Sequence, residues 1–350
     1  MPNSEADCFC GNSGTTIRFC TALAALGYGR YRLDGVARMR QRPIEPLGEA
    51  IQRLGGGIEY HDRPGYPPLT VHARGLSGGT VMFDNPASSQ FVSALLLAAP
   101  AAMGDVMFEV RGPLVSAPYV RMTTAVMSAM GVVVIEDIQP ESARFIVAAH
   151  QRYRAGALPI EPDASNASYF LAAPAVAGGR VTVRGLGSNS VQGDIGIVDL
   201  LEQMGCAAER GPDALTVHGP QRGTKLKALD VDLNAMPDMV QTVAVLALFA
   251  DGVTRLRNVA NLRVKETDRL AALAHELTAL GAGVVEHAEG LTIRPPDRIT
   301  PAAIDTYDDH RMAMSFALVG LAVEGIVIND PECVSKTFPD FFDRWSQLIL

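Results

Sequence analysis

A short charged segment, residues 263–269 within NLRVKETDRLAAL, holds five charged side chains of both signs, although only 19% of the residues in this chain are charged. Cations in such a cluster could bind an anionic ligand, and carboxylates beside them could accept or donate protons. Lys265 and Arg269 are four residues apart, a spacing that brings two side chains to one face of a helix. A solvent-exposed charged face is the alternative interpretation.

The residues after this segment predict the helix that would carry it. Leu270, Leu273 and Leu277 form an apolar stripe at helical spacing, so we expect residues 266–268 to lie in the first turn. Acidic side chains are favourable there because they face the positive end of the helix dipole, which alone would explain Glu266 and Asp268. Cations in a first turn oppose the dipole, and an external anion would account for them.

An internal repeat of about 75 residues places similar helix starts along the whole chain. Polar clusters open Ala- and Leu-rich runs at GNSGTTIRF, SSQFVSALLLAA, DASNASYFLAA, DMVQTVAVLALFA and DHRMAMSFALVG. Each run leads into a β-branched strand, a loop and a second helix. The second helices are expected to end just before Gly55, Gly131, Gly205 and Gly281. A period of this length is too long for a solenoid repeat and suits a module of strands and helices packed around a core.

The repeat predicts an α/β protein with mixed sheets in two domains, residues 1–158 and 159–350. The first copy reaches its helix by residue 15. We therefore expect the chain to begin inside a module, with further sequence upstream.

The helix starts are rich in Ser, Thr, Asp and Asn, which could simply cap the first turns. Alternatively, several helix N-termini could converge on anions, because exposed N–H groups and the helix dipole favour negative charge. Cations at matching points of the repeat favour the second interpretation. These are Arg18, Arg42, Lys265, Arg269 and Arg311.

Composition excludes several classes of function. The net charge of −8 and the low aromatic content of 6% argue against a nucleic-acid-binding protein. The five cysteines form no C-x-x-C pair and no metal-binding spacing, which is typical of reduced thiols in a cytoplasmic protein. The start lacks the features of a signal peptide, and the apolar stretch from Met312 to Ile328 predicts a buried helix followed by a strand.

Read together, the motifs resemble those of the EPSP synthase (3-phosphoshikimate 1-carboxyvinyltransferase) family. GNSGTTIRF, RPIEPL, SSQFVSALLLAAP, VSAPY, DASNASYFLAA, NLRVKETDRL, DDHRMAMSFAL and SKTFPDFF occur in the family's order and span nearly all 350 residues. The resemblance implies an inside-out α/β barrel in each of two domains, built from six βαβαββ modules. A first module with a P-G-S-K-S segment is missing from this chain, so we expect weak activity and an unpaired sheet edge in the C-terminal barrel.

The resemblance implies transfer of the enolpyruvyl group of phosphoenolpyruvate to the 5-hydroxyl of 3-phosphoshikimate, on the route to chorismate and aromatic amino acids. Asp238 matches the acid that accepts the hydroxyl proton, and Glu266 matches a second proton-handling acid. The positions that match phosphoenolpyruvate contacts are Gly14, Arg42, Gln90, Arg269, Arg311 and Lys336. The positions that match 3-phosphoshikimate contacts are Ser88, Ser89, Gln90, Ser116, Tyr119, Asp238, Asn261 and Lys265. Arg18 and His310 are expected to support these contacts without touching substrate.

The family resemblance further implies no metal or organic cofactor and a monomer in the cytoplasm. The family is the target of glyphosate, which competes with phosphoenolpyruvate, but the sequence does not predict whether this chain resists it. Two alternatives remain. One is the related transferase that acts on UDP-N-acetylglucosamine, which KETDR and the absence of a cysteine-bearing loop disfavour. The other is a noncatalytic anion-binding remnant or assembly partner.

Overall fold

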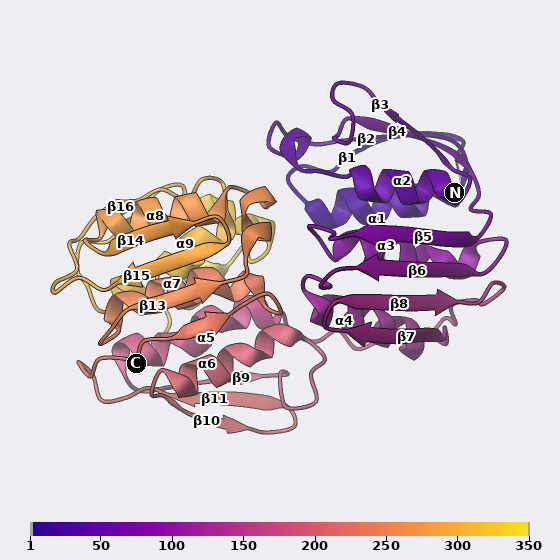
Figure 1. Cartoon of the computed structure of the whole chain (residues 1–350). Helices are drawn as coiled ribbons and strands as arrows, with labels where there is room; N and C mark the ends of the chain where they lie inside the picture. The colour runs from indigo at the N-terminus through magenta and orange to yellow at the C-terminus, as the bar shows by residue number, and fades with distance from the viewer. Residues whose placement is uncertain (1–2, 349–350) are drawn as a thin grey trace. The chain divides into compact units, whose positions relative to one another are not determined.

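The computed structural model describes residues 3–348, and its contacts divide the chain between Pro159 and Ile160 into two compact units, here called the N-terminal unit and the C-terminal unit (Figure 1). No helix among the described residues is both long and apolar enough to cross a membrane.

The N-terminal unit contains two copies of one module. The first copy is β1 (Glu5–Phe9), α1 (Gly14–Ala25), β2 (Tyr28–Asp34), α2 (Glu45–Arg53), β3 (Gly57–Tyr60) and β4 (Leu69–Arg74). The second copy is β5 (Gly79–Asp84), α3 (Gln90–Ala98), β6 (Val106–Arg111), α4 (Ala117–Ala129), β7 (Val134–Gln139) and β8 (Ser142–Val147). Both sheets have the order first, second, fourth, third strand, with only the first two parallel. The predicted βαβαββ module is confirmed.

The C-terminal unit contains three copies. The first copy is α5 (Ala164–Ala177), β9 (Arg180–Arg184), α6 (Ile197–Gln203), β10 (Ala207–Arg210) and β11 (Ala214–His218). The middle copy is β12 (Asp230–Asp232), α7 (Val240–Leu246), β13 (Thr254–Arg257), α8 (Arg269–Ala279), β14 (Gly283–His287) and β15 (Gly290–Arg294). The last copy is β16 (Ala303–Ile304), α9 (His310–Phe316), β17 (Val327–Ile328) and α10 (Phe341–Trp345). The middle copy has the same four-stranded order as the N-terminal modules. Within residues 3–348 the flanking sheets have three and two strands.

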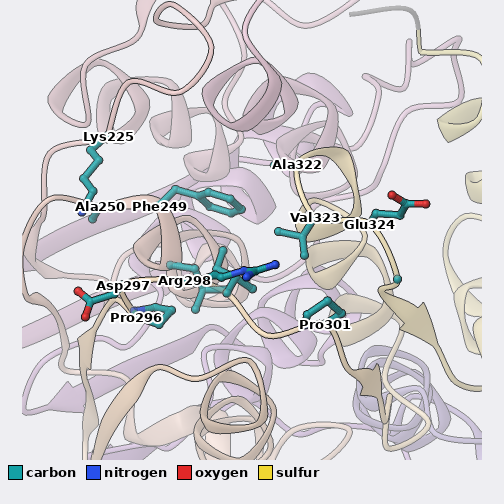
Figure 2. A pocket seen from close by; sticks show the side chains of 13 residues that line it. Lys225, Phe249, Ala250, Pro296, Asp297, Arg298, Pro301, Ala322, Val323 and Glu324 are labelled. Atoms are coloured by element: carbon teal, nitrogen blue, oxygen red, sulfur yellow. The ribbon is translucent and has the colours of Figure 1, made fainter.

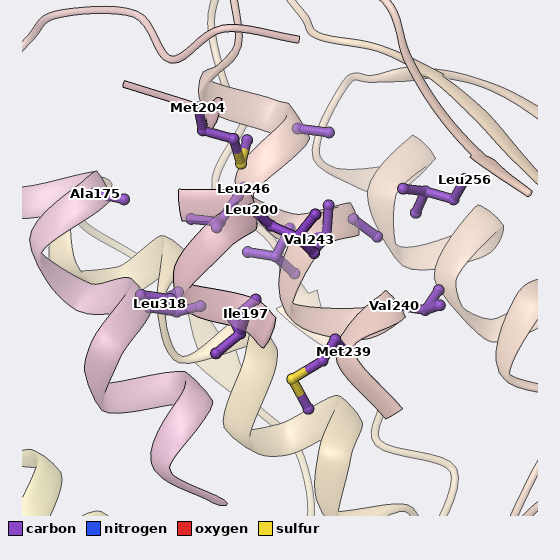
Figure 3. Close-up of a cluster of buried hydrophobic side chains, with 14 of the residues drawn as sticks. Ala175, Ile197, Leu200, Met204, Met239, Val240, Val243, Leu246, Leu256 and Leu318 are labelled. Atoms are coloured by element: carbon purple, nitrogen blue, oxygen red, sulfur yellow. The ribbon is translucent and has the colours of Figure 1, made fainter. Parts of the chain in front are cut away.

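In each unit the helices pack on one another and the sheets lie outside them. In the N-terminal unit α1 packs on α3, and α3 packs on α4. In the C-terminal unit α5 packs on α7, and α7 packs on α9; Figure 3 shows the apolar side chains, such as Val243 and Leu246, that fill this interior. Helix α5 is buried on nearly every side, which explains why its apolar residues do not form a single stripe.

The second helices end where the repeat predicts. Gly55 and Gly281 follow α2 and α8 with φ of +93° and +95°. A residue with a Cβ is strained in this left-handed conformation, so glycine suits the position that terminates a helix.

Two local expectations were wrong. The first repeat, which was expected to be incomplete at its start, has an opening strand, because Glu5–Phe9 pairs in parallel with β2. Helix α8 begins at Arg269 with Asp268 as its N-cap, so Glu266 and Thr267 precede the helix instead of lying in its first turn. The Asp268 carboxylate accepts the backbone N–H of Ala271 and so caps the start of α8.

Candidate active site

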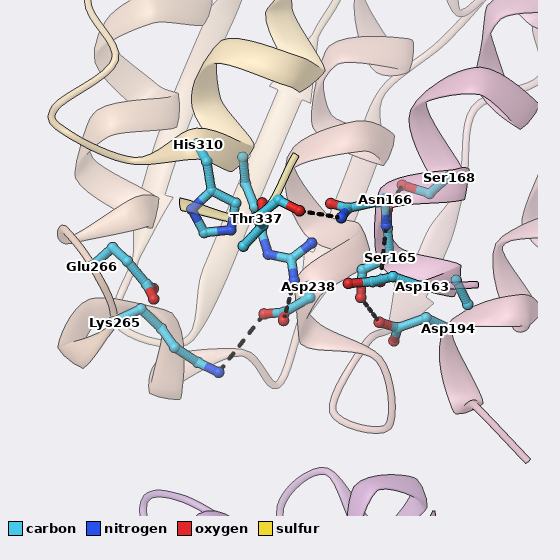
Figure 4. A network of polar contacts seen from close by, with 12 residues as sticks. Asp163, Ser165, Asn166, Ser168, Asp194, Asp238, Lys265, Glu266, His310 and Thr337 are labelled. Atoms are coloured by element: carbon cyan, nitrogen blue, oxygen red, sulfur yellow. Dashed lines mark hydrogen bonds and ion pairs between the residues drawn. The ribbon is translucent and has the colours of Figure 1, made fainter. Parts of the chain in front are cut away.

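A single carboxylate, Asp238, gathers three cations in the C-terminal unit. It lies in the 3-10 turn Pro237–Met239 that leads into α7. Its Oδ2 accepts Arg311 NH2 at 2.8 Å, and its Oδ1 lies 3.1 Å from Arg269 NH1 and 3.7 Å from Lys265 Nζ (Figure 4). Burial alone would raise the pKa of Asp238, but Arg311, Lys265 and Arg269 together hold that pKa well below its usual value.

Arg269 is the most deeply enclosed of these cations, with 1% of its surface exposed. Its Nε and NH2 donate to the two oxygens of Asp309 at 2.7 and 3.1 Å, and NH2 also donates to Glu266 at 3.0 Å. Burial would lower the pKa of Arg269, but the carboxylates of Asp309, Glu266 and Asp238 outweigh burial and raise this pKa above its usual value. The guanidinium therefore stays charged and joins three carboxylates.

Glu266 contacts cations from two parts of the chain, and one of them, Lys336, is 70 positions away in sequence. One of its oxygens accepts Arg269 NH2, and the other accepts Lys336 Nζ at 2.5 Å. Lys336 ends the 3-10 segment Pro331–Lys336, which packs on α9. The structure thus brings Glu266 and Lys336 together, as the sequence predicts for two residues of one site.

Asp309 is a site residue that sequence reasoning missed. It is fully buried and caps α9 by accepting the N–H of Arg311 at 3.0 Å. Its two carboxylate oxygens also accept hydrogen bonds from Arg269 Nε and NH2. One carboxylate thereby fixes both the start of the helix that carries Arg311 and the side chain of Arg269. Its position at the opening of the fifth repeat was the signal that could have identified it.

Two further predicted residues have buried polar atoms in the same unit. His310 is buried, with Nδ1 3.7 Å from Asp309 Oδ1, and burial followed by the nearby Arg311 lowers its pKa to about 3. It is therefore neutral near pH 7. The side-chain oxygen of Asn261 is buried and makes no hydrogen bond to another residue of the described chain.

In the N-terminal unit, Gly14 is the first residue of α1 and two arginines lie against it. A Cβ at this position would be 2.5 Å from Arg42 NH2 and 2.9 Å from Arg18 NH1. Arg42 NH1 donates to the backbone oxygen of Asn12 at 2.9 Å. The absence of a side chain at Gly14 therefore leaves room for both guanidinium groups.

Gln90, the first residue of α3, connects α3 to α1. Its side-chain oxygen accepts Arg18 NH1 at 2.6 Å, and its amide nitrogen donates to Thr15 Oγ1 at 2.9 Å. Arg18 also donates to the backbone oxygen of Pro43 and lies over the ring of Phe91 at 5.0 Å. Thr15 was not among the predicted residues; it adjoins Gly14 and orients Gln90.

The remaining predicted residues lie at helix starts of the same unit. Ser88 accepts the N–H of Gln90 at 3.3 Å, and Ser89 is the N-cap residue of α3. Ser116 precedes α4 in a left-handed conformation, with φ of 55° and ψ of 44°, and Tyr119 lies in the first turn of α4. Strained conformations of this kind are concentrated at functional sites.

A cavity of about 690 Å³ in the C-terminal unit lies away from the charged cluster (Figure 2). It is bounded by the residues that follow α7 and α9, such as Phe249 and Val323, whereas Asp238 and Arg311 lie at the starts of those helices. Lys225 and Arg298 on its wall are balanced by Asp297 and Glu324. The cavity therefore offers no net charge that would select an anion.

The C-terminal cluster can bind anions and transfer protons, because its carboxylates lie among four cations in a partly buried setting. The described residues contain no group of three or more His, Cys, Asp or Glu side chains arranged to hold a metal ion.

Comparison with known proteins gives consistent matches. The sequence model for EPSP synthase (3-phosphoshikimate 1-carboxyvinyltransferase) matches residues 1–345. The 3-phosphoshikimate 1-carboxyvinyltransferase of Shewanella halifaxensis is 48% identical over 341 residues, which cover 97% of this chain and 78% of that protein. The protein of the same name from Nostoc punctiforme is 48% identical over 349 residues, 100% of this chain and 80% of that protein. The solved structure of EPSP synthase from Acinetobacter baumannii has a TM-score of 0.74 and 25% identity, covering 98% of this chain and 79% of that one.

Proposed function

The chain belongs to the EPSP synthase family, and from this premise we infer that it transfers the enolpyruvyl group of phosphoenolpyruvate to the 5-hydroxyl of 3-phosphoshikimate and releases inorganic phosphate. The hydroxyl oxygen forms a bond to C2 of phosphoenolpyruvate while C3 gains a proton. Loss of a C3 proton then expels phosphate and restores the double bond. The observation that supports this chemistry is the pair Asp238 and Glu266 held among Lys265, Arg269, Arg311 and Lys336.

Asp238 is proposed as the base that accepts the hydroxyl proton. Its low pKa makes it a weak base while three cations face it. A bound substrate brings phosphate and carboxylate groups that compete for the same cations. Asp238 then loses part of this stabilisation, so its pKa rises toward the value needed for proton transfer.

Glu266 is proposed to handle the proton at C3. Its two oxygens bind Arg269 and Lys336, so its position is fixed from two sides. We propose that Lys336 and Arg311 bind the anionic groups of phosphoenolpyruvate, and that Arg269, joined to Asp309, holds the carboxylates of Asp238 and Glu266 in place.

The N-terminal unit is proposed to recognise substrate without transferring protons. Arg42 would bind phosphoenolpyruvate beside the bare Cα of Gly14, and Gln90 would contact both substrates. The proposed contacts to 3-phosphoshikimate are Ser88, Ser89, Ser116 and Tyr119 here and Asn261 and Lys265 in the C-terminal unit. We further propose a cytoplasmic monomer that needs no cofactor, which light scattering and activity in the presence of a chelator would check.

The decisive experiment follows phosphate release by the full chain from phosphoenolpyruvate and 3-phosphoshikimate, in the wild type and in Asp238→Asn. Removing a general base costs about 10²- to 10⁴-fold in kcat. Asp230→Asn is the matched control, because Asp230 pairs with Arg257 on the surface. Equal rates for the wild type and Asp238→Asn would refute the role of Asp238.

The same assay separates the alternatives. Phosphate release with UDP-N-acetylglucosamine in place of 3-phosphoshikimate would identify the related transferase. Binding of 3-phosphoshikimate by calorimetry without any phosphate release would identify a noncatalytic anion-binding protein.

A further inference from the structure

One face of α5 contacts the chain segment that carries Lys336. Asn166, Tyr169 and Phe170 are spaced by three and four residues, so they lie on the same side of the helix. The start of this helix is fixed, because Asp163 caps it by accepting the N–H of Asn166 at 3.1 Å. None of the three residues has a role in the function proposed above.

Asn166 holds the backbone next to Lys336. Its side-chain amide donates to the backbone oxygen of Thr337 at 3.3 Å, across 171 positions of sequence (Figure 4). Because Lys336 is the preceding residue, this bond limits where its flexible side chain can begin.

An aromatic cluster holds the rest of this segment on α5. The Phe170 ring lies 5.9 Å from Phe338 and 5.4 Å from Trp345, and Tyr169 meets Phe341 edge-on at 6.0 Å. Aromatic pairs at these distances stabilise packing beyond the apolar area that they bury. These contacts pack the segment from Phe338 to Trp345 against α5.

Tyr169 also reaches Arg311. Its hydroxyl oxygen accepts Arg311 NH1 at 3.3 Å, while Arg311 NH2 donates to Asp238. Tyr169 is fully buried, and burial raises its pKa to about 12, so the phenol stays neutral. It directs the guanidinium without neutralising the charge that an anion would use.

We propose that Asn166 and Tyr169 are positioning residues, through which α5 sets the places of Lys336 and Arg311 for one small phosphorylated anion. This inference rests on the proposed function, in which that anion is phosphoenolpyruvate. Both cations have long side chains whose rotamers must be ordered on binding, and fixing them beforehand reduces that cost. The cation pair thus depends on a helix that touches no reacting atom.

The kinetic test compares Asn166→Ala and Tyr169→Phe with the wild type. Each change deletes one hydrogen bond, so we expect KM for phosphoenolpyruvate to rise about fivefold while KM for 3-phosphoshikimate stays within twofold. Asn329→Ala and Tyr153→Phe are the controls, because their side chains bond to Asp305 and to the backbone of Leu97, outside the site. Equal rises for both substrates would indicate general loosening and would overturn the proposal.

The fluorescence of Trp345, the only tryptophan of the chain, reports on the packing of the segment from Phe338 to Trp345 against α5. Phe170→Leu removes a ring beside it and should shift its emission, whereas Tyr169→Phe keeps the ring and should not. A shifted emission in Tyr169→Phe, with an unchanged KM for phosphoenolpyruvate, would mean that Tyr169 has only a packing role.

A second measurement does not depend on turnover. Calorimetric titration with inorganic phosphate should show binding to the wild type and about fivefold weaker binding to Asn166→Ala and Tyr169→Phe. Such a result would support positioning even if the wild type released no phosphate from phosphoenolpyruvate, which is the outcome that defeats the proposed function. Equal affinity in all three proteins, or no binding to the wild type, would overturn the positioning role.

Discussion

The arginines predicted for the site are held by different kinds of oxygen in the two units. In the C-terminal unit, Arg269 and Arg311 bind the carboxylates of Asp238 and Asp309. In the N-terminal unit, Arg42 and Arg18 donate to carbonyl oxygens, those of Asn12 and Pro43 in the backbone and of Gln90 in a side chain. Carboxylates can exchange protons, whereas carbonyl oxygens orient a cation at any ordinary pH. This difference supports the proposal that the C-terminal cluster transfers protons and the N-terminal one recognises substrate.

The largest effect on stability should come from breaking the C-terminal cluster, in which the carboxylates of Asp238, Glu266 and Asp309 hold the cations. Arg269→Leu would leave Asp309 buried without its partner, and removing one member of a buried ion pair costs about 3–5 kcal/mol of unfolding free energy. Urea denaturation measures this loss. Arg344→Leu is the control, because Arg344 and Asp340 form an exposed pair for which we expect a change below about 1 kcal/mol. A similar small change in Arg269→Leu would show that the cluster does not stabilise the C-terminal unit.

A pH dependence should follow from His310 in the same cluster. The unfolded chain binds a proton at this histidine below pH 6.5, but the folded chain does so only near pH 3, so stability is complete above pH 6.5 and falls as the pH falls. The loss between pH 7 and pH 5 is about 2 kcal/mol, at about 1.4 kcal/mol per pH unit.

His310→Gln should therefore have a flatter stability profile between pH 7 and pH 5, measured by urea denaturation at each pH. His275→Gln is the control, since that side chain is 73% exposed. Parallel profiles for the wild type and His310→Gln would contradict the assignment of a neutral, buried imidazole.

Much of the fold followed from the sequence because it depends on local signals. The repeated polar helix starts and the glycines at 55, 131, 205 and 281 act within a few residues of themselves, and the structure has helices where they predicted them. The start of α8 was misplaced because a leucine stripe gives the helical phase but not the first residue. The Asp268 cap decides that residue.

The site was less accessible to sequence reasoning because its contacts join distant residues. Asp309 meets Arg269 across 40 positions, and Tyr169 meets Arg311 across 142. Family motifs predicted which residues would touch substrate. They gave no indication of residues such as Thr15 or Asn166, whose roles depend on the packing of one helix against another segment.

The smallest of the three effects should come from Gly14→Ala in the N-terminal cluster of Gly14, Arg18 and Arg42. The new methyl group would lie 2.5 Å from Arg42 NH2, the far end of a flexible side chain, so the guanidinium must move and its bond to Asn12 weakens. We expect KM for phosphoenolpyruvate to rise about tenfold, equivalent to about 1.4 kcal/mol, with little loss of stability. Steady-state kinetics and urea denaturation measure the two quantities.

Gly320→Ala is the matched control, because a Cβ there meets no atom within 4 Å. If the N-terminal cluster only recognises substrate, Gly14→Ala should raise KM and leave the pH dependence of kcat unchanged, since the contacts of Arg42 and Arg18 to carbonyl oxygens do not titrate. A shifted pH dependence of kcat in Gly14→Ala would show that this cluster also influences proton transfer. That result would contradict the proposal that the N-terminal unit only recognises substrate.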